Sequence, residues 1–184
     1  MKGITKLAKV FTKIFEVGHW VAVALTAAVG VLSVGAPKWL GYVMDTEGLK
    51  TQKEISVYGF EVTAANGAGE IDYITLLLFS VGAVIIFARM AMVFRNLHLM
   101  IKKSEVNTPF QADNIRMLKE IGIFSIAVPA VGLIMSTIIR LAVGVDAAEI
   151  SVNLEGFVMG LVVLCLTQFF IHGAELEKDV DGLL

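Results

Sequence analysis

The chain has 184 residues, of which 57% are hydrophobic and 17% are charged, and its formal net charge is −2. An average soluble domain carries roughly 25% charged residues, so this composition favours a membrane protein. A net charge so close to zero excludes a strong general attraction to nucleic acid, and we expect no direct nucleic-acid partner. The length fits a single membrane domain over residues 1–184.

The first apolar run follows a basic N-terminal segment that carries four lysines. The run extends over residues 14–34, long enough to cross a bilayer as a helix of about 20 residues. A signal peptide is the competing interpretation, because such peptides also place basic residues before an apolar stretch. The run is long for a signal peptide, and no clear small-residue cleavage site follows it. We therefore expect a transmembrane helix over about residues 12–34.

Residues 35–70 differ from the rest of the chain, since they contain Pro37, several glycines and mixed charges. Within this segment, β-branched and aromatic residues concentrate at 55–62, and a turn-like NGAG sequence follows. We expect one short strand at 55–62, with residues 40–44 as a weak hairpin partner. The whole segment is predicted to be a small extracytoplasmic cap without a hydrophobic core of its own.

Three further apolar runs predict transmembrane helices over about residues 71–98, 109–142 and 152–174. Pro129 lies inside one of them, where neighbouring helices can satisfy the carbonyl that proline leaves free. The fold class that follows is an all-α integral membrane protein. Its expected architecture is a four-transmembrane-helix bundle with a small extracytoplasmic β-containing loop.

The polar segment between the second and third of the four runs, KKSEVNTPFQADNIRMLKEIG, carries the signals of a helix start. Thr108 is a favoured N-cap, Pro109 suits the first helical position, and Gln111 can close a capping box. Apolar residues at three-residue spacing then predict one apolar helix face. These residues are Ile115, Leu118 and Ile121.

Two stretches resemble a known bacterial family. TPFQADNIRMLKEIG resembles a motif of the membrane family called domain of unknown function (DUF) 2975, and FFIHGAELEKDVDGLL is similar to its closing segment. The likeness extends from about Ile74 to the end of the chain. It implies a four-helix protein of the bacterial inner membrane without an established activity or a catalytic site. It also implies a frequent genetic neighbour, a small helix-turn-helix regulator of the Xre type.

The basic residues predict the topology. Lysines precede the first run, and further lysines and arginines flank the segment at 102–121. The positive-inside rule therefore places both termini and this segment in the cytoplasm of a multi-pass inner-membrane protein, with residues 35–70 outside.

A cytoplasmic docking surface follows from this topology. The segment at 102–121 is basic and the tail from Glu175 is acidic, so opposite charge can draw them together, with Phe110 and Leu176 as apolar anchors. We expect a regulatory or sensory protein that docks a cytoplasmic partner, such as a small helix-turn-helix regulator. The alternative is that the basic residues meet only anionic membrane lipid. The predicted partner-binding residues are Phe110, Asn114, Arg116, Lys119, Glu175 and Glu177.

Arg89 is the most unusual residue inside an apolar run. A charge at such depth costs a few kcal/mol, roughly, unless it snorkels to the interface or finds a partner. Glu16 lies at a compatible depth in the first run, so an intramembrane Glu16–Arg89 pair is predicted as one alternative. The alternative function is binding or transport of a lipid or small molecule at a site between helices near Arg89.

The sequence predicts no catalytic site, metal site or cofactor. His19, His98 and His172 lie near cytoplasmic helix ends, and none of them pairs with another at the helical spacing that a shared haem or metal would need. P-loop, dinucleotide, zinc and nucleophile-elbow patterns are missing from the sequence, so we expect no enzyme. Cys165 is expected to be a small buried core residue. The oligomeric state stays open, a homo-oligomer included.

Overall fold

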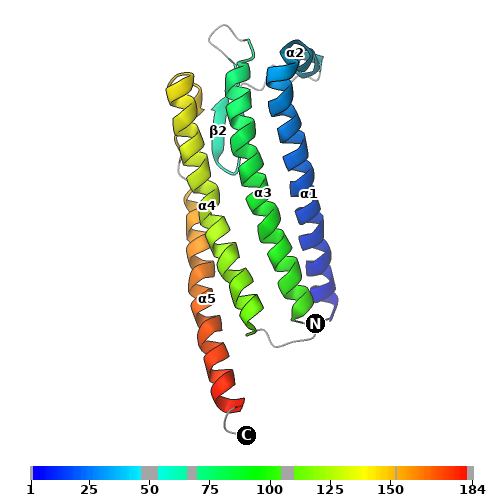
Figure 1. The fold of residues 1–184 in the computed structure, drawn as a ribbon, viewed down its shortest axis with the longest axis vertical. Coiled ribbons are helices and arrows are strands. Elements are labelled where there is room, and N and C mark those ends of the chain that lie inside the picture. Colours follow the sequence, from blue (N-terminus) through cyan, green and yellow to red (C-terminus); the bar gives the residue numbers. More distant parts are fainter. Residues whose placement is uncertain (1, 47–53, 66–69, 105–109, 152, 182–184) are drawn as a thin grey trace. The chain divides into compact units, whose positions relative to one another are not determined.

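The computed structural model of the protein describes residues 2–46, 54–65, 70–104, 110–151 and 153–181 (Figure 1). Four of its helices are long and apolar enough to cross a membrane, which confirms the four predicted apolar helices. A short helix and a small antiparallel sheet complete the secondary structure. The long helices are α1 (Lys2–Gly35), α3 (Tyr73–Lys103), α4 (Ala112–Ala142) and α5 (Leu154–Asp181), and the short helix is α2 (Pro37–Thr46).

Three of the long helices extend past the predicted bounds. α1 begins at Lys2 instead of about residue 12, α3 continues to Lys103, and α5 continues to Asp181. Lysine, arginine and glutamate are good helix formers, so a helix can continue through charged turns after its apolar run has ended. The apolar run therefore locates a span but does not define the ends of its helix.

The start of α4 differs from the prediction in the other direction. Thr108 and Pro109, the predicted cap, lie outside the described residues. The backbone amides of Asn114 and Ile115 donate to the carbonyl of Gln111 at 2.9 and 3.1 Å. Gln111 thus takes the N-cap position, and the helix begins at Ala112 instead of Pro109.

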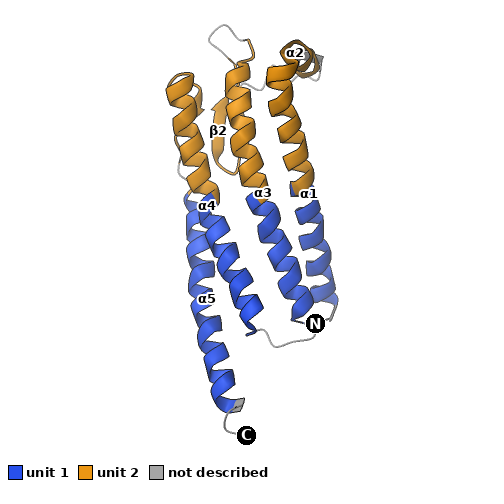
Figure 2. Ribbon diagram, viewed as in Figure 1, with its two compact units in different colours: residues 1–19, 89–127, 154–184 blue, residues 20–88, 128–153 orange. Residues whose placement is uncertain are grey.

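The chain forms two compact units (Figure 2). Unit 1 comprises residues 1–19, 89–127 and 154–184, and unit 2 comprises residues 20–88 and 128–153. α1, α3 and α4 each contribute to both units, whereas α5 belongs to unit 1 alone.

Unit 2 contains a β-hairpin where the sequence predicts a single strand. β1 (Glu54–Val57) and β2 (Phe60–Thr63) pair antiparallel, and β3 (Ala148–Glu149) adds to the far side of β2. Tyr58 and Gly59 join them with φ of 51° and 81°, so both central residues have positive φ, as in a type I′ turn. The predicted strand partner at 40–44 is helical, as part of α2. The predicted single strand is divided into two because the Tyr58-Gly59 turn reverses the chain in its middle.

The hairpin packs into the core of unit 2, which it shares with the helices α3 and α4. Phe60 is 0% exposed and stacks on Phe79 at 5.2 Å between ring centroids. Two glycines, Gly82 in α3 and Gly132 in α4, make room for it: a Cβ at Gly82 would lie 2.7 Å from the Phe60 ring, and one at Gly132 would lie 3.4 Å from its Cβ. Figure 1 shows β2 between these helices.

The hairpin also reaches far along α3. Its turn residue Tyr58 packs edge-on against Phe87, with ring centroids 6.3 Å apart. Phe87 lies about 21 Å along the helix axis from Tyr73, where α3 begins, at 1.5 Å per residue. Asn153 holds the turn from the other side, donating from Nδ2 to the Tyr58 carbonyl at 3.1 Å.

Unit 1 consists of antiparallel helix pairs. α1 contacts α3 through the stacked rings of Phe15 and Phe94, 5.0 Å apart. α3 contacts α4 through a hydrogen bond from Asn96 to Glu120, and α4 meets α5 where Gly122 faces Gly160. The antiparallel pairing brings the N-terminal end of α1 and the C-terminal end of α5 to the same end of this unit (Figure 2).

Candidate interaction surface

The ends of α3 and α4 are joined by an ion pair. Lys103 Nζ lies 2.6 Å from Asp113 Oδ2, across a connection that lies outside the described residues. Both side chains are well exposed, so solvent screens the attraction between them and the pair contributes little to stability. It orients the start of α4 more than it stabilises the fold.

Arg116 and Lys119 are exposed on the first turns of α4, as their predicted role in partner binding requires. Arg116 is 69% exposed and lies 3.9 Å from Glu120 Oε1, one turn further along its own helix. The other oxygen of Glu120 accepts a hydrogen bond of 2.9 Å from the buried Asn96 of α3. The Arg116 side chain is therefore held next to the helix pair, with its guanidinium facing outward.

Asn114 cannot contact a docking partner, which corrects its predicted role. Its side chain is 1% exposed. Residues at positions i, i+4 and i+7 share one helix face, and Asn114 shares its face with the buried Leu118 and Ile121. The predicted apolar face of α4 is confirmed at these two residues and includes Asn114.

Phe110 is partly buried, and its ring packs against α5 within unit 1. Its ring meets Phe170 of α5 edge-on at 5.6 Å, and a Cβ at Gly173 would lie 2.6 Å from its Cε1. Phe110 therefore contacts α5 through apolar groups at Phe170 and Gly173, before the acidic tail begins at Glu175. The ion pairs described for Arg116 and Glu175 are each made within their own helix.

The tail of α5 is helical and exposed. Glu175 accepts from His172 Nδ1 at 3.2 Å, and Leu176 is 58% exposed, whereas Glu177 is partly buried. Beyond Gly173, which contacts Phe110, α5 continues to Asp181, about 12 Å of helix. The tail therefore extends past the point where α4 begins.

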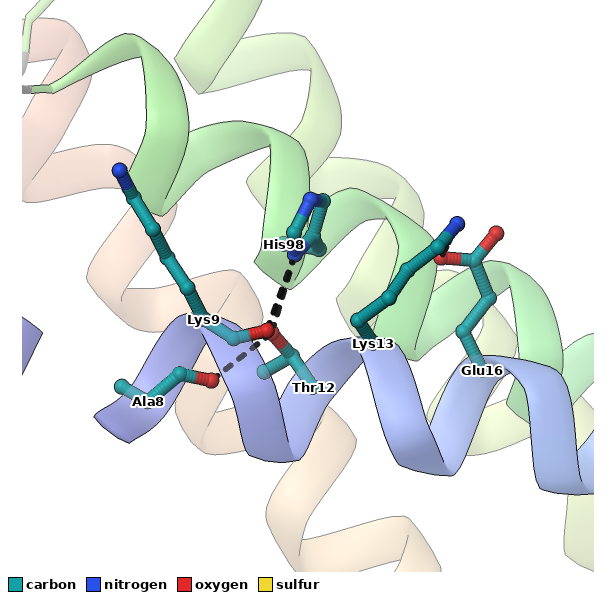
Figure 3. Close-up of polar contacts among 6 residues, drawn as sticks. All are labelled: Ala8, Lys9, Thr12, Lys13, Glu16 and His98. Carbon is teal, nitrogen blue, oxygen red and sulfur yellow. Dashed lines mark hydrogen bonds and ion pairs between the residues drawn. The ribbon is translucent and has the colours of Figure 1, made fainter. Parts of the chain in front are cut away.

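The predicted Glu16–Arg89 pair is not formed. Glu16 Oε2 lies 3.0 Å from Lys13 Nζ, one turn away in α1 (Figure 3). Arg89 lies over the ring of Phe124 in α4, 5.2 Å from its centroid. The reason is angular: at roughly 100° per residue, Arg89 points about 140° away from Phe94, which contacts α1. Arg89 therefore faces the α4 side of α3.

His98 and His19 each hydrogen-bond to a backbone carbonyl of α1. His98 Nδ1 lies 3.2 Å from the Lys9 carbonyl and 3.4 Å from Thr12 Oγ1 (Figure 3). A carbonyl can only accept, so Nδ1 carries the proton and donates. His19 Nδ1 donates to the Phe15 carbonyl at 2.7 Å in the same way. Within the described part of the chain, histidine, cysteine and acidic residues form no group of three or more suited to a metal ion.

α5 carries an exposed apolar face that the sequence interpretation missed. Only 11% of its most apolar stretch is buried, against 44% in α3 and 39% in α4. Cys165 lies on this face and is exposed, so its predicted place in the core is wrong. Apolar residues surround α5 on all sides in the sequence, so their spacing does not show which face is exposed. The exposed residues include Val158, Leu161, Val162, Leu166 and Phe169, which line a shallow hollow of about 290 Å³.

Unit 2 contains an apolar groove between α1 and α3, with a volume of about 650 Å³. Gly30 and Ser80 lie at its floor, where a Cβ on the glycine would come within 2.9 Å of Ser80 Cβ. Aliphatic residues such as Val34 and Val84 line its walls. The groove can accept an aliphatic chain, and its lining contains no charged residue among those described.

No protein-family model, curated protein or solved structure matches the chain. The likeness drawn from the two quoted motifs therefore stays a prediction from those residues.

Proposed function

We propose that this chain is a multi-pass protein of the bacterial inner membrane whose four long helices span as a bundle, with both termini in the cytoplasm. The charges support this orientation, because lysines occupy the first half of α1 and basic residues occupy the end of α3. The connection at 143–153 carries two acids and no lysine or arginine, as an outer loop does.

We propose further that the protein is regulatory and holds a cytoplasmic protein at a docking surface formed by α4 and α5. The observation that carries this proposal is the exposed tail of α5, which continues past Phe110 as an ordered helix with Leu176 outward. The exposed cations Arg116 and Lys119 lie on the first turns of α4, in the same unit as the tail. The docking surface comprises Arg116, Lys119, Glu175 and Leu176.

A small DNA-binding regulator fits this surface as the partner. An apolar anchor with charges of both signs around it is typical of a protein interface with a polar rim. The helix-turn-helix regulator implied by the family likeness is cytoplasmic and small enough to be held by one such surface. Of the predicted partner-binding residues, the docking surface retains the exposed Arg116, Lys119 and Glu175.

The orientation is tested by thiol labelling of intact cells in a Cys165→Ser background. Lys38→Cys, in α2, should react with a membrane-impermeant reagent, and Ser104→Cys, after α3, should react only after lysis. Both positions are exposed, so access to reagent and not burial decides the result. Labelling of Ser104→Cys on intact cells would overturn the orientation.

Docking is tested by combining Arg116→Glu with Leu176→Glu, and recovering bound cytoplasmic proteins from native membranes. The native chain should retain a DNA-binding protein that the double variant loses. A matched control is Ile4→Glu, because Ile4 is 76% exposed on the first turn of α1, outside the docking surface. Retention by all three forms, or by none, contradicts the proposal.

A second candidate function is lipid binding, and the groove between α1 and α3 favours it. The groove lies in unit 2 and its lining does not include Arg89, so this version differs from the site predicted near Arg89. Val81→Trp should fill the groove, since Val81 lines it and is 47% exposed. Native mass spectrometry should then show loss of bound phospholipid; unchanged lipid content would exclude the groove as its site.

A further inference from the structure

The side of α5 that faces away from α4 carries a regular apolar stripe. Gly160 and Thr167 are buried on the α4 side, where a Cβ at Gly160 would collide with Ile126. The opposite side carries exposed residues spaced by four, three and four positions, a pattern that brings side chains to one helix face. We call these residues the α5 seam: Val158, Val162, Cys165 and Phe169.

The seam has the spacing of a coiled coil. Alternating steps of four and three residues repeat every 3.5 residues on average, which is the period at which two helices wrap around each other with knobs in holes. A shallow hollow of about 290 Å³ lies along the seam, lined by the seam residues together with Leu161 and Leu166. The face thus offers both a knob, Phe169 at 73% exposure, and a hole to receive one.

Lipid tails do not cover the whole seam if the bilayer follows the apolar run of α4. Gly122 faces Gly160 and Phe110 faces Gly173, so the second half of the seam runs level with the first turns of α4. Those turns carry Arg116 and Lys119, and the apolar run of α4 begins only near Ile121. A bilayer that matches the apolar run of α4 therefore ends before Phe169.

Water does not suit the seam either, because its first half lies level with the apolar run of α4. An occupant must offer an apolar helix face both inside and just outside the bilayer. On a second α5 in the same membrane, the apolar face crosses the bilayer surface at the same height, since both copies insert in one orientation.

We infer that the protein forms a homodimer through the α5 seam, with the two α5 helices parallel and Cys165 of each copy at the pairing line. Val162 and Cys165 then meet their own counterparts across a two-fold axis along the membrane normal. This inference rests on the proposed membrane insertion, because a shared bilayer is what makes the helices parallel.

Oxidative cross-linking in native membranes tests the seam. The sequence has one cysteine, so any disulfide of the native chain joins two copies. Copper phenanthroline should convert two Cys165 thiols to one disulfide and give a dimer that dithiothreitol reverses, because paired seam positions bring Cα atoms within about 7 Å. The first control is Cys165→Ser, which should abolish the dimer.

Two neighbouring valines provide the matched pair in the Cys165→Ser background. Val162→Cys places the thiol on the seam, and Val163→Cys places it roughly 100° around the helix, toward α4. The seam variant should give several-fold more dimer. Equal cross-linking of Val162→Cys and Val163→Cys overturns the inference. It is also overturned if neither the native Cys165 nor Val162→Cys forms a cross-linked dimer.

A second measurement does not depend on disulfide chemistry. Phe169→Glu should convert the purified protein from dimer to monomer in light scattering, whereas Ile4→Glu should leave it dimeric. A native monomer, or a dimeric Phe169→Glu variant, also overturns the inference. These results depend neither on a cytoplasmic partner nor on which side the termini occupy. The dimer can therefore be disproved while the proposed docking holds, and the docking can be disproved while the dimer holds.

Discussion

α3 and α4 meet in both units, but by different physical means (Figure 2). In unit 2 they enclose the ring of Phe60, which fills the space opened by Gly82 and Gly132. In unit 1 polar side chains also join them, through a hydrogen bond from Asn96 to Glu120 and an ion pair at the helix ends, beside the buried Leu118 and Ile121 of α4. The first contact depends on shape and the second on charge and solvent. Substitutions should therefore affect the two units by different amounts.

Phe60→Ala should cause the largest loss of stability. It removes a ring that is 0% exposed and leaves a cavity between two helices, which costs about 3–5 kcal/mol in other cores. Denaturant unfolding of the detergent-solubilised protein measures the loss. Phe11→Ala is the control, since Phe11 is 51% exposed in α1 and its removal leaves no cavity. A Phe60→Ala protein as stable as the control would mean that the hairpin does not fill the core of unit 2.

Gly160→Ala should be next in size and should act on α5. The added Cβ would lie 2.9 Å from the Gly122 carbonyl oxygen and would meet Ile126, so α5 must move away from α4. Overpacking of this kind costs about 1–3 kcal/mol. Limited proteolysis near the start of α5 should become faster. Gly18→Ala in α1 has open space around its Cβ and should not be destabilised; a matching loss there would show that the effect is not a contact with α4.

Asn96→Ala should weaken unit 1 by about 1 kcal/mol, because a single interhelical hydrogen bond within a membrane protein contributes this order of free energy. The measurement is a double-mutant cycle with Glu120→Ala, in which the coupling energy reports the 2.9 Å contact alone. A coupling energy of zero would show that this hydrogen bond does not stabilise the contact between α3 and α4. Asn96→Ala combined with Ile4→Ala serves as the control pair, since Ile4 is 76% exposed and no described contact joins it to Asn96 or Glu120.

Asp113→Asn should have the smallest effect on stability, because both side chains of its pair with Lys103 are exposed and solvent screens them. The loss should also shrink at high salt, which screens exposed charges. Unfolding curves at low and high ionic strength measure this dependence. A salt-independent loss as large as that of Phe60→Ala would contradict the division between the two units.

Much of the fold follows from local patterns. Four apolar runs, each with basic or polar residues at its ends, predict four long helices, and the α4 face with Leu118 and Ile121 follows from their spacing. The hairpin could not be predicted in the same way. Its two strands share one continuous β-branched and aromatic run, and only the positive φ of Tyr58 and Gly59 divides it.

The candidate site was predictable in part. Charge and position along the chain placed Arg116, Lys119 and Glu175 at the surface, where the structure also has them. Asn114 and Phe110 were misplaced, since polarity does not reveal that a short amide lies on a buried face, nor does apolarity reveal that a ring packs on Gly173.

The sequence by itself determined which segments are helical and apolar enough to span a membrane, and where the charges lie, because hydropathy and helical period are properties of neighbouring residues. Only the tertiary structure decided how far each helix is shifted along its neighbour. That shift depends on close contacts between residues far apart in the chain, such as Gly122 with Gly160 and Phe110 with Gly173. It is this shift that places the second half of the α5 seam, Cys165 and Phe169, level with the charged turns of α4.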